Sequence, residues 1–146
     1  MELLKFSERL EELIFDTELP QNEFAGKCGL TPSEISKYLK GNCMPSLSSV
    51  LKIADFFKCS VDYVLGIEDQ KYSTCFHPIP PFAQRLRFLL PHFGYTGYRF
   101  CKEAKNISAA RYYDWLNGKH EPSLENIINI AEFFDCSVDF VIGRSN

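Results

Sequence analysis

Two long segments of this chain are near copies of each other. Residues 45–66 read PSLSSVLKIADFFKCSVDYVLG, and residues 122–143 read PSLENIINIAEFFDCSVDFVIG. Aligned without gaps, 13 of the 22 positions are identical, and most of the others exchange similar side chains. A repeat of this length marks one structural unit that occurs twice. The chain of 146 residues is therefore expected to fold as two small domains.

The similarity continues upstream of these segments. At an offset of 76 residues, the apolar positions that correspond are Phe6, Leu10, Leu13 and Ile14 with Phe82, Leu86, Leu89 and Leu90. Their spacing of i, i+4, i+7 and i+8 is that of one face of an α-helix. By Gly41 and Gly118 the offset has grown to 77. The second copy therefore carries one extra residue, which lies between Phe100 and Ile107.

Prolines separate the two copies. Pro78, Pro80 and Pro81 are incompatible with a continuous helix and favour extended backbone. The expected boundaries are residues 1–67 for copy one, 68–80 for a proline-containing linker, and 81–146 for copy two, the divergent copy.

Each copy is predicted to be all-helical, because no run shows the alternation of a β-strand bounded by hairpin turns. The five helices of copy one are expected at 3–16, at 20–27 with Pro20 in its first turn, at 31–40, after Ser46 and after Ser60. Leu47, Val50, Leu51, Ala54 and Phe57 predict the core face of the fourth helix.

The third helix of copy one has the clearest start signal. Thr31 is an expected N-cap, Pro32 takes the first helical position, and Glu34 completes a capping box. Gly41 is expected to end the helix.

The second and third helices form a helix-turn-helix pattern. A small residue, Ala25, allows the two helices to approach closely, and Gly29 allows a tight turn between them. Leu30, Ile35 and Leu39 are expected to anchor the third helix to the core. Its opposite face, which carries Ser33, Ser36, Lys37 and Lys40, is expected to be polar and exposed. A helix of this kind fits the major groove of DNA.

The segment LPQNEFAGKCGLTPSEISKYLKGNCMPSLSSVLKIADFFKCSVDYVLG resembles the Cro/CI-type phage-repressor helix-turn-helix family, also called the XRE family. The resemblance covers nearly all of both copies. It implies two tandem five-helix, lambda-repressor-like DNA-binding domains, and a sequence-specific transcriptional regulator whose partner is double-stranded DNA. Such proteins usually dimerise, so the resemblance is compatible with a homodimer or with an intramolecular pseudo-dimer of the two copies.

The resemblance also implies which residues contact DNA. In the family, a glutamine that opens the second helix contacts phosphate, and Gln21 holds that place. The first, second and sixth residues of the recognition helix commonly reach bases, and they are Pro32, Ser33 and Lys37. Gly41 and Asn42 match positions that touch phosphate after the helix, and Ser36 and Lys40 lie at the margin.

Copy two departs from this pattern. Gly97, or Tyr98 if the extra residue lies earlier, replaces the glutamine, and Arg111 replaces the capping-box glutamate. The expected base-reading positions are Ala109, Ala110 and Asp114. Asp114 repels phosphate unless it accepts a hydrogen bond from cytosine. The cations that can offset it are Arg111, Lys119, Lys102 and Lys105.

Three aromatic residues on the third helix of copy two, Tyr112, Tyr113 and Trp115, admit two interpretations. Aromatic side chains at this spacing are more often core, and Trp115 is expected there. The alternative is that they face a partner. Copy two is then a protein-docking domain that no longer recognises bases in the major groove of DNA.

The net charge of the chain counts against the hypothesis that it binds DNA. The formal net charge is −3, with −4 in residues 1–77 and +1 in residues 78–146. Neither half has the strongly basic character typical of a DNA-binding domain. The alternative is a protein-interaction module, antitoxin-like or an adaptor, that kept the fold and lost DNA binding.

Other functions are disfavoured by missing patterns. No apolar run is long enough to span a membrane, and no basic leader precedes an apolar segment, so a cytoplasmic protein is expected. The six cysteines form no Cys-x-x-Cys pair and are expected to be small buried hydrophobes. Cys75 and His77 in the linker are read as incidental. No phosphate loop, zinc helix or nucleophile elbow is present, so no enzyme, cofactor or metal is expected.

Overall fold

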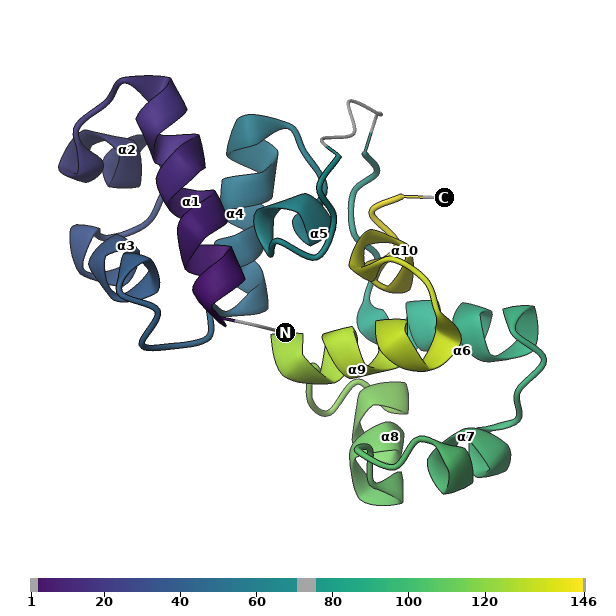
Figure 1. Ribbon diagram of the computed structural model, residues 1–146. Coiled ribbons are helices and arrows are strands. Elements are labelled where there is room, and N and C mark those ends of the chain that lie inside the picture. The colour runs from purple at the N-terminus through teal and green to yellow at the C-terminus, as the bar shows by residue number, and fades with distance from the viewer. Residues whose placement is uncertain (1–2, 71–75, 146) are drawn as a thin grey trace. The chain divides into compact units, whose positions relative to one another are not determined.

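The computed structural model describes residues 3–70 and 76–145, and within them it contains ten helices and no strand (Figure 1). The chain divides into two compact units, Met1–Thr74 and Cys75–Asn146. The predicted all-α fold with two tandem helix-turn-helix domains is confirmed. Residues 71–75 of the expected linker, including Cys75, lie outside the described residues.

The first unit contains five helices in the predicted order. Their bounds are α1 Leu3–Thr17, α2 Gln21–Cys28, α3 Pro32–Leu39, α4 Leu47–Phe57 and α5 Val61–Val64. Helix α1 packs against α2, α3 and α5, while α4 packs against α2 and α5. The apolar face predicted for α1 is buried, as Phe6, Leu10, Leu13 and Ile14 all lie in the core.

Caps fix where these helices begin. The Thr31 hydroxyl accepts a hydrogen bond from the Glu34 amide at 3.1 Å, and the Glu34 carboxylate accepts one from the Thr31 amide at 2.9 Å, so the predicted capping box is confirmed. Ser46 and Ser60 cap α4 and α5 as predicted. Pro20 is not in the first turn of α2, because its backbone is extended (ψ 150°) and it precedes the helix.

The core face of α4 differs in part from the prediction. Val50 and Ala54 are buried, but Leu47, Leu51 and Phe57 are only half-buried. Ile53, which was not predicted, is fully buried. Because α4 packs against both α2 and α5, its contact stripe runs through positions 50, 53 and 54, and the residues at the edges of that stripe remain partly open.

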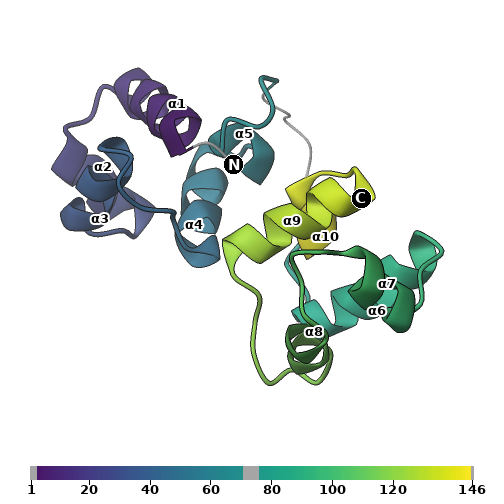
Figure 2. The same ribbon diagram turned by 60° about the horizontal axis from the view of Figure 1, so that its bottom comes forward.

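The second unit repeats the same helix order (Figure 2). Its bounds are α6 Phe82–His92, α7 Gly97–Glu103, α8 Ala109–Leu116, α9 Leu124–Phe134 and α10 Val138–Ile142. Helix α6 packs against α8 and α10, and α10 also packs against α9. Phe82, Leu86, Leu89 and Leu90 are buried, which confirms the predicted face of α6. Residues 76–81 are not helical, in agreement with their prolines.

The cysteines agree only partly with the prediction of small buried hydrophobes. Cys28 and Cys59 are buried, whereas Cys43, Cys101 and Cys136 are half-buried, and none of these five forms a disulfide. Burial raises the pKa of the Cys28 thiol to about 11, so it stays protonated and inert at neutral pH. The described residues hold no cluster of side chains suited to a metal ion, and none of their helices is long and apolar enough to cross a membrane.

Candidate nucleic-acid interface

The turn between α2 and α3 is tight and closed by backbone hydrogen bonds. Gly29 has φ 85°, which is the left-handed conformation that favours glycine, and the Leu30 amide donates to the Ala25 carbonyl at 2.9 Å. Ala25 is fully buried, so the two helices approach closely as predicted. The Lys52 ammonium donates to the Gly29 carbonyl at 3.3 Å and ties this turn to α4.

One face of α3 is fixed to the core. Ile35 and Tyr38 are buried, and the Tyr38 ring lies 5.7 Å from the ring of Phe6. The Ser7 hydroxyl donates to the Tyr38 carbonyl at 2.7 Å, which holds the end of α3 against α1. Leu39, which was predicted as an anchor, is only half-buried, because Tyr38 takes that place in the core.

The opposite face of α3 is open to solvent. Ser33, Lys37 and Lys40 are exposed and Ser36 is half-buried, so the polar face predicted from the sequence is present. Neither Lys37 nor Lys40 forms an ion pair with a described residue. Two cations on a rigid, capped helix are thus available for an anionic partner.

The other predicted contact residues surround this face. Pro32 is exposed at the start of α3, and Asn42 is exposed just after it. Gly41 is half-buried with φ 71°, and an added Cβ would lie 3.2 Å from the Ser7 hydroxyl oxygen. Gln21 is exposed at the first position of α2, and it lines a hollow together with Leu39 of α3. These four residues and the polar face of α3 are thus the candidate contact residues of the first unit.

Copy two has a longer turn between the equivalent helices. Five residues, 104–108, separate α7 from α8, whereas three residues, 29–31, separate α2 from α3. The extra residue of copy two predicts a turn one residue longer; the turn is two residues longer, because α7 is also one residue shorter than α2. Ala104 caps α7 with φ −79° and ψ 90°, which is not the left-handed geometry of Gly29. The Ser108 hydroxyl accepts from the Arg111 amide at 3.2 Å, so it caps α8 without a glutamate partner.

Gly97 takes the place of Gln21, because both are the first residues of their helices. A Cβ at Gly97 would lie 2.6 Å from the Tyr112 hydroxyl oxygen. Tyr112 aligns with Ile35 of copy one, and its larger ring is buried beside Gly97. Burial raises the pKa of the Tyr112 hydroxyl, and Cys101 and Tyr113 raise it further, so it stays protonated at neutral pH. A side chain at the position of Gln21 therefore fits copy two only if Tyr112 shifts.

Substituting Gly97 by alanine is expected to destabilise the second unit by about 1 to 3 kcal/mol, the usual cost of overpacking. The added methyl group meets Tyr112, although alanine is normally the better helix former. Urea unfolding followed by Trp115, the single tryptophan of the chain, measures the change. Tyr112→Phe in the Gly97→Ala background is expected to restore most of the loss. Gly26→Ala, whose Cβ would meet nothing within 4 Å, serves as the control. Because Trp115 lies in the second unit, circular dichroism follows this variant, and Gly26→Ala is expected to stabilise the first unit. Stabilisation by Gly97→Ala would contradict this packing.

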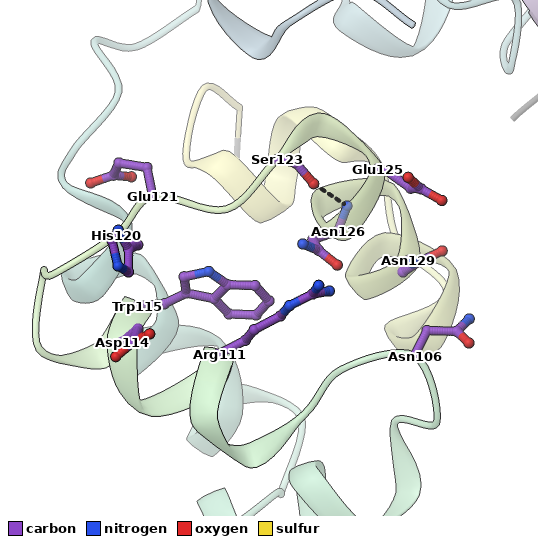
Figure 3. A pocket seen from close by; sticks show the side chains of 10 residues that line it. All are labelled: Asn106, Arg111, Asp114, Trp115, His120, Glu121, Ser123, Glu125, Asn126 and Asn129. Carbon is purple, nitrogen blue, oxygen red and sulfur yellow. Dashed lines mark hydrogen bonds between the residues drawn. The ribbon is translucent and has the colours of Figure 1, made fainter.

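The polar face of α8 borders a hollow of about 780 Å³ that α8 shares with the loop after it and with α9 (Figure 3). Asp114 lies here at the position that Lys37 occupies in copy one, and Glu121 and Glu125 line the same hollow. In Figure 3, the side chain of Arg111 extends from α8 toward Asn126 on α9. Three carboxylates against one arginine make this hollow unfavourable for phosphate.

The remaining predicted residues of copy two divide between core and surface. Trp115 and Tyr112 are buried, which confirms the core interpretation for Trp115. Tyr113 is exposed. Lys119 is exposed in the turn after α8, where its amide donates to the Asp114 carbonyl at 2.9 Å.

Comparison with protein-family models agrees with this geometry. The helix-turn-helix model matches residues 18–64 and matches again at residues 93–141. The chain belongs to the helix-turn-helix family. Each match runs from the segment before the helix-turn-helix to the fifth helix of its copy, so both copies of this Cro/CI-type domain are members. The helix-turn-helix family is one of DNA-binding regulators. Comparisons with curated proteins and with solved structures gave no significant match.

Proposed function

We propose that this helix-turn-helix protein is a sequence-specific, DNA-binding transcriptional regulator in which copy one reads the operator. The observation that carries the proposal is the state of α3. Ile35 and Tyr38 fix one face of it to the core, while Ser33, Lys37 and Lys40 on the other face are exposed. A rigid helix with an exposed polar face is the element that enters the major groove.

The chemistry of each side chain supports a definite role. Lys37 donates to guanine, and the Ser33 hydroxyl pairs with several bases. Gln21, at the start of α2, donates to phosphate together with Lys40 and Asn42. Pro32 has no backbone N–H, so it contacts DNA only through its ring. Direct readout thus rests on two side chains, and the operator motif of one copy is expected to be short.

Copy two is proposed to hold the protein in position without reading bases. Asp114, Glu121 and Glu125 surround the face that would approach DNA. Arg111 and Lys119 are the cations on that side available for phosphate. One reader per chain means that a site with two half-sites, about 34 Å apart, requires a homodimer. A pseudo-dimer within one chain would need copy two to read bases as well.

Salt dependence is expected to report the number of phosphates engaged. Each neutralised phosphate lowers log K by about 0.9 per unit of log salt concentration. The cations proposed for phosphate are Lys40, Arg111 and Lys119, and two chains with three each give a slope of about −5, which is a loss of about a thousandfold between 50 and 200 mM salt. Fluorescence anisotropy with a labelled duplex measures this slope. A slope of about −3 would indicate one chain per duplex, and no slope would contradict phosphate contact.

A mobility shift tests the proposed function directly. The purified full chain is mixed with a duplex that carries the promoter region of its own gene, in the presence of excess random-sequence competitor. A shifted band that survives the competitor is expected. Its absence at 50 mM salt would overturn the regulator proposal.

A protein-interaction module is the second candidate, and exposed aromatic rings on copy two favour it. Tyr98 is 76% exposed at the start of α7, and Tyr113 is exposed on α8. Solvent-exposed tyrosines are enriched at protein interfaces. Stoichiometric recovery of one protein partner, together with no mobility shift, would favour this candidate over the regulator.

A further inference from the structure

A hollow of about 660 Å³ lies where the end of α1 meets the start of α2 and the end of α3. We call it the acidic groove. Its apolar residues include Phe15, Leu19 and Leu39, and its carboxylates are Glu11, Asp16 and Glu18. No basic side chain lines it. The groove is thus lined both by apolar side chains and by charges of one sign.

The apolar lining of the acidic groove leaves hydrophobic surface in water. Phe15 is 82% exposed, although it follows the buried Ile14 on α1. A second hollow of about 570 Å³ continues along α1 past Phe15 to Glu8 and Glu12. Covering an aromatic ring and the leucines beside it is favourable at about 25 cal/mol per Å² of apolar surface. A contiguous apolar surface with a polar rim marks an interaction site.

The carboxylates around Phe15 are unfavourable for α1 itself. Glu8, Glu11, Glu12, Phe15 and Asp16 follow the spacing i, i+3, i+4, i+7 and i+8, so like charges lie side by side on one helix face. Asp16 also lies in the last turn of α1, where the helix dipole disfavours an anion, and no basic residue lies there. Glu12 pairs with Arg9 at 3.7 Å. Glu8, Glu11, Asp16 and Glu18 have no ion-pair partner among the described residues.

We infer that the acidic groove docks a basic amphipathic segment of a partner protein, with Lys or Arg side chains beside one or two large apolar residues. The apolar anchor covers Phe15, Leu19 and Leu39, and the cations meet Glu11, Asp16 and Glu18. The charge of the groove argues against other macromolecules. The carboxylates Glu11, Asp16 and Glu18 repel phosphate, so DNA reaches only the edge of the groove at Gln21 and does not fill it. A second copy of this chain carries net charge −3.

If copy one binds DNA as proposed above, docking of a partner in the acidic groove is expected to compete with DNA binding. Gln21 lines the acidic groove and is also the proposed phosphate contact of α2. A docked segment covers Gln21 and adds its own bulk beside the start of α2. The partner and the operator therefore compete for the first unit, so the partner releases the protein from DNA.

Selection from a library of random 12-residue peptides displayed on phage tests the inference. The immobilised full chain is the bait, and no DNA is present, so the result does not depend on operator binding. The expected consensus holds at least two Lys or Arg residues next to an aliphatic or aromatic residue. A synthetic peptide with that consensus is then titrated by fluorescence anisotropy.

Two variants place the peptide in the acidic groove. The first variant is a triple substitution that removes the charges of the groove, Glu11→Gln, Asp16→Asn and Glu18→Gln. The second variant is Phe15→Ser. Each of the two is expected to weaken peptide binding at least tenfold. The charge-matched control is Glu121→Gln with Glu125→Gln and Glu132→Gln in copy two, which is expected to bind as the unaltered chain does. Circular dichroism checks folding, and the copy-one triple variant is expected to melt higher because like-charge repulsion is removed.

Three results would overturn the inference. The first is a selected consensus without basic residues or no enrichment at all. The second is peptide binding that is insensitive to the groove variants. The third is a dimer in sedimentation velocity that dissociates on Phe15→Ser, because a second copy would then occupy the groove. Competition between the peptide and an operator duplex is measured separately. Its failure alone would contradict the coupling to DNA and leave the docking site intact.

Discussion

Replacing Gln21 and Lys37 together by alanine is expected to abolish the mobility shift on the promoter duplex. A base contact is worth about 1 to 3 kcal/mol, and loss of the phosphate contact weakens binding to all sequences alike. The combined loss is about 3 kcal/mol, which lowers affinity more than a hundredfold. Both side chains are exposed on the first unit, so neither substitution removes a core contact.

The matched control for this variant is Gln84→Ala with Lys102→Ala. These residues are of the same types, are exposed, and lie on α6 and α7 of copy two. The control removes the same charge but is expected to keep the shift. An unchanged shift for Gln21→Ala with Lys37→Ala would exclude copy one as the reader of the operator.

Asp139→Ala is expected to lower the free energy of unfolding of the second unit by about 3 to 5 kcal/mol, because it leaves a buried guanidinium without its anion. The Arg144 guanidinium donates to the Asp139 carboxylate at 2.8 Å, and their side chains are only 2% and 3% exposed. The guanidinium also lies 3.8 Å from the centroid of the Phe76 ring, and the His77 amide donates to the Arg144 carbonyl at 2.8 Å.

Urea unfolding followed by Trp115 fluorescence measures the effect of Asp139→Ala, since Trp115 is buried in the same unit. The double variant Asp139→Leu with Arg144→Met removes both charges. It is expected to cost less than half as much as the single variant, because no buried charge is left alone. A single variant as stable as the unaltered chain would contradict the buried ion pair.

Local signals explain why much of the fold was predictable. The capping box of Thr31 and Glu34, the left-handed Gly29 and the apolar face of α1 each depend on residues within a few positions of one another. The sequence also placed Ser33, Lys37 and Lys40 on one face of α3 by helical spacing alone, and the structure leaves that face exposed.

Packing between distant residues explains what was missed. Tyr38 replaced Leu39 as the anchor of α3 because Phe6 and Ser7, more than thirty positions away, contact it. The clash that a side chain at Gly97 would meet depends on Tyr112. The acidic groove combines residues of α1, α2 and α3, and no single segment of the sequence carries its pattern. Exposed apolar residues such as Phe15 within a helical pattern are the signal that points to it.

Selection from random duplexes by the purified full chain tests most directly whether α3 reads bases. The expected product is an enriched short motif that contains guanine and is present twice, with centres one helical turn of DNA apart. The motif is expected to disappear when the variant carrying Gln21→Ala and Lys37→Ala makes the selection. A pool that shows no enriched motif, or the same motif recovered by that variant, would contradict sequence reading by copy one.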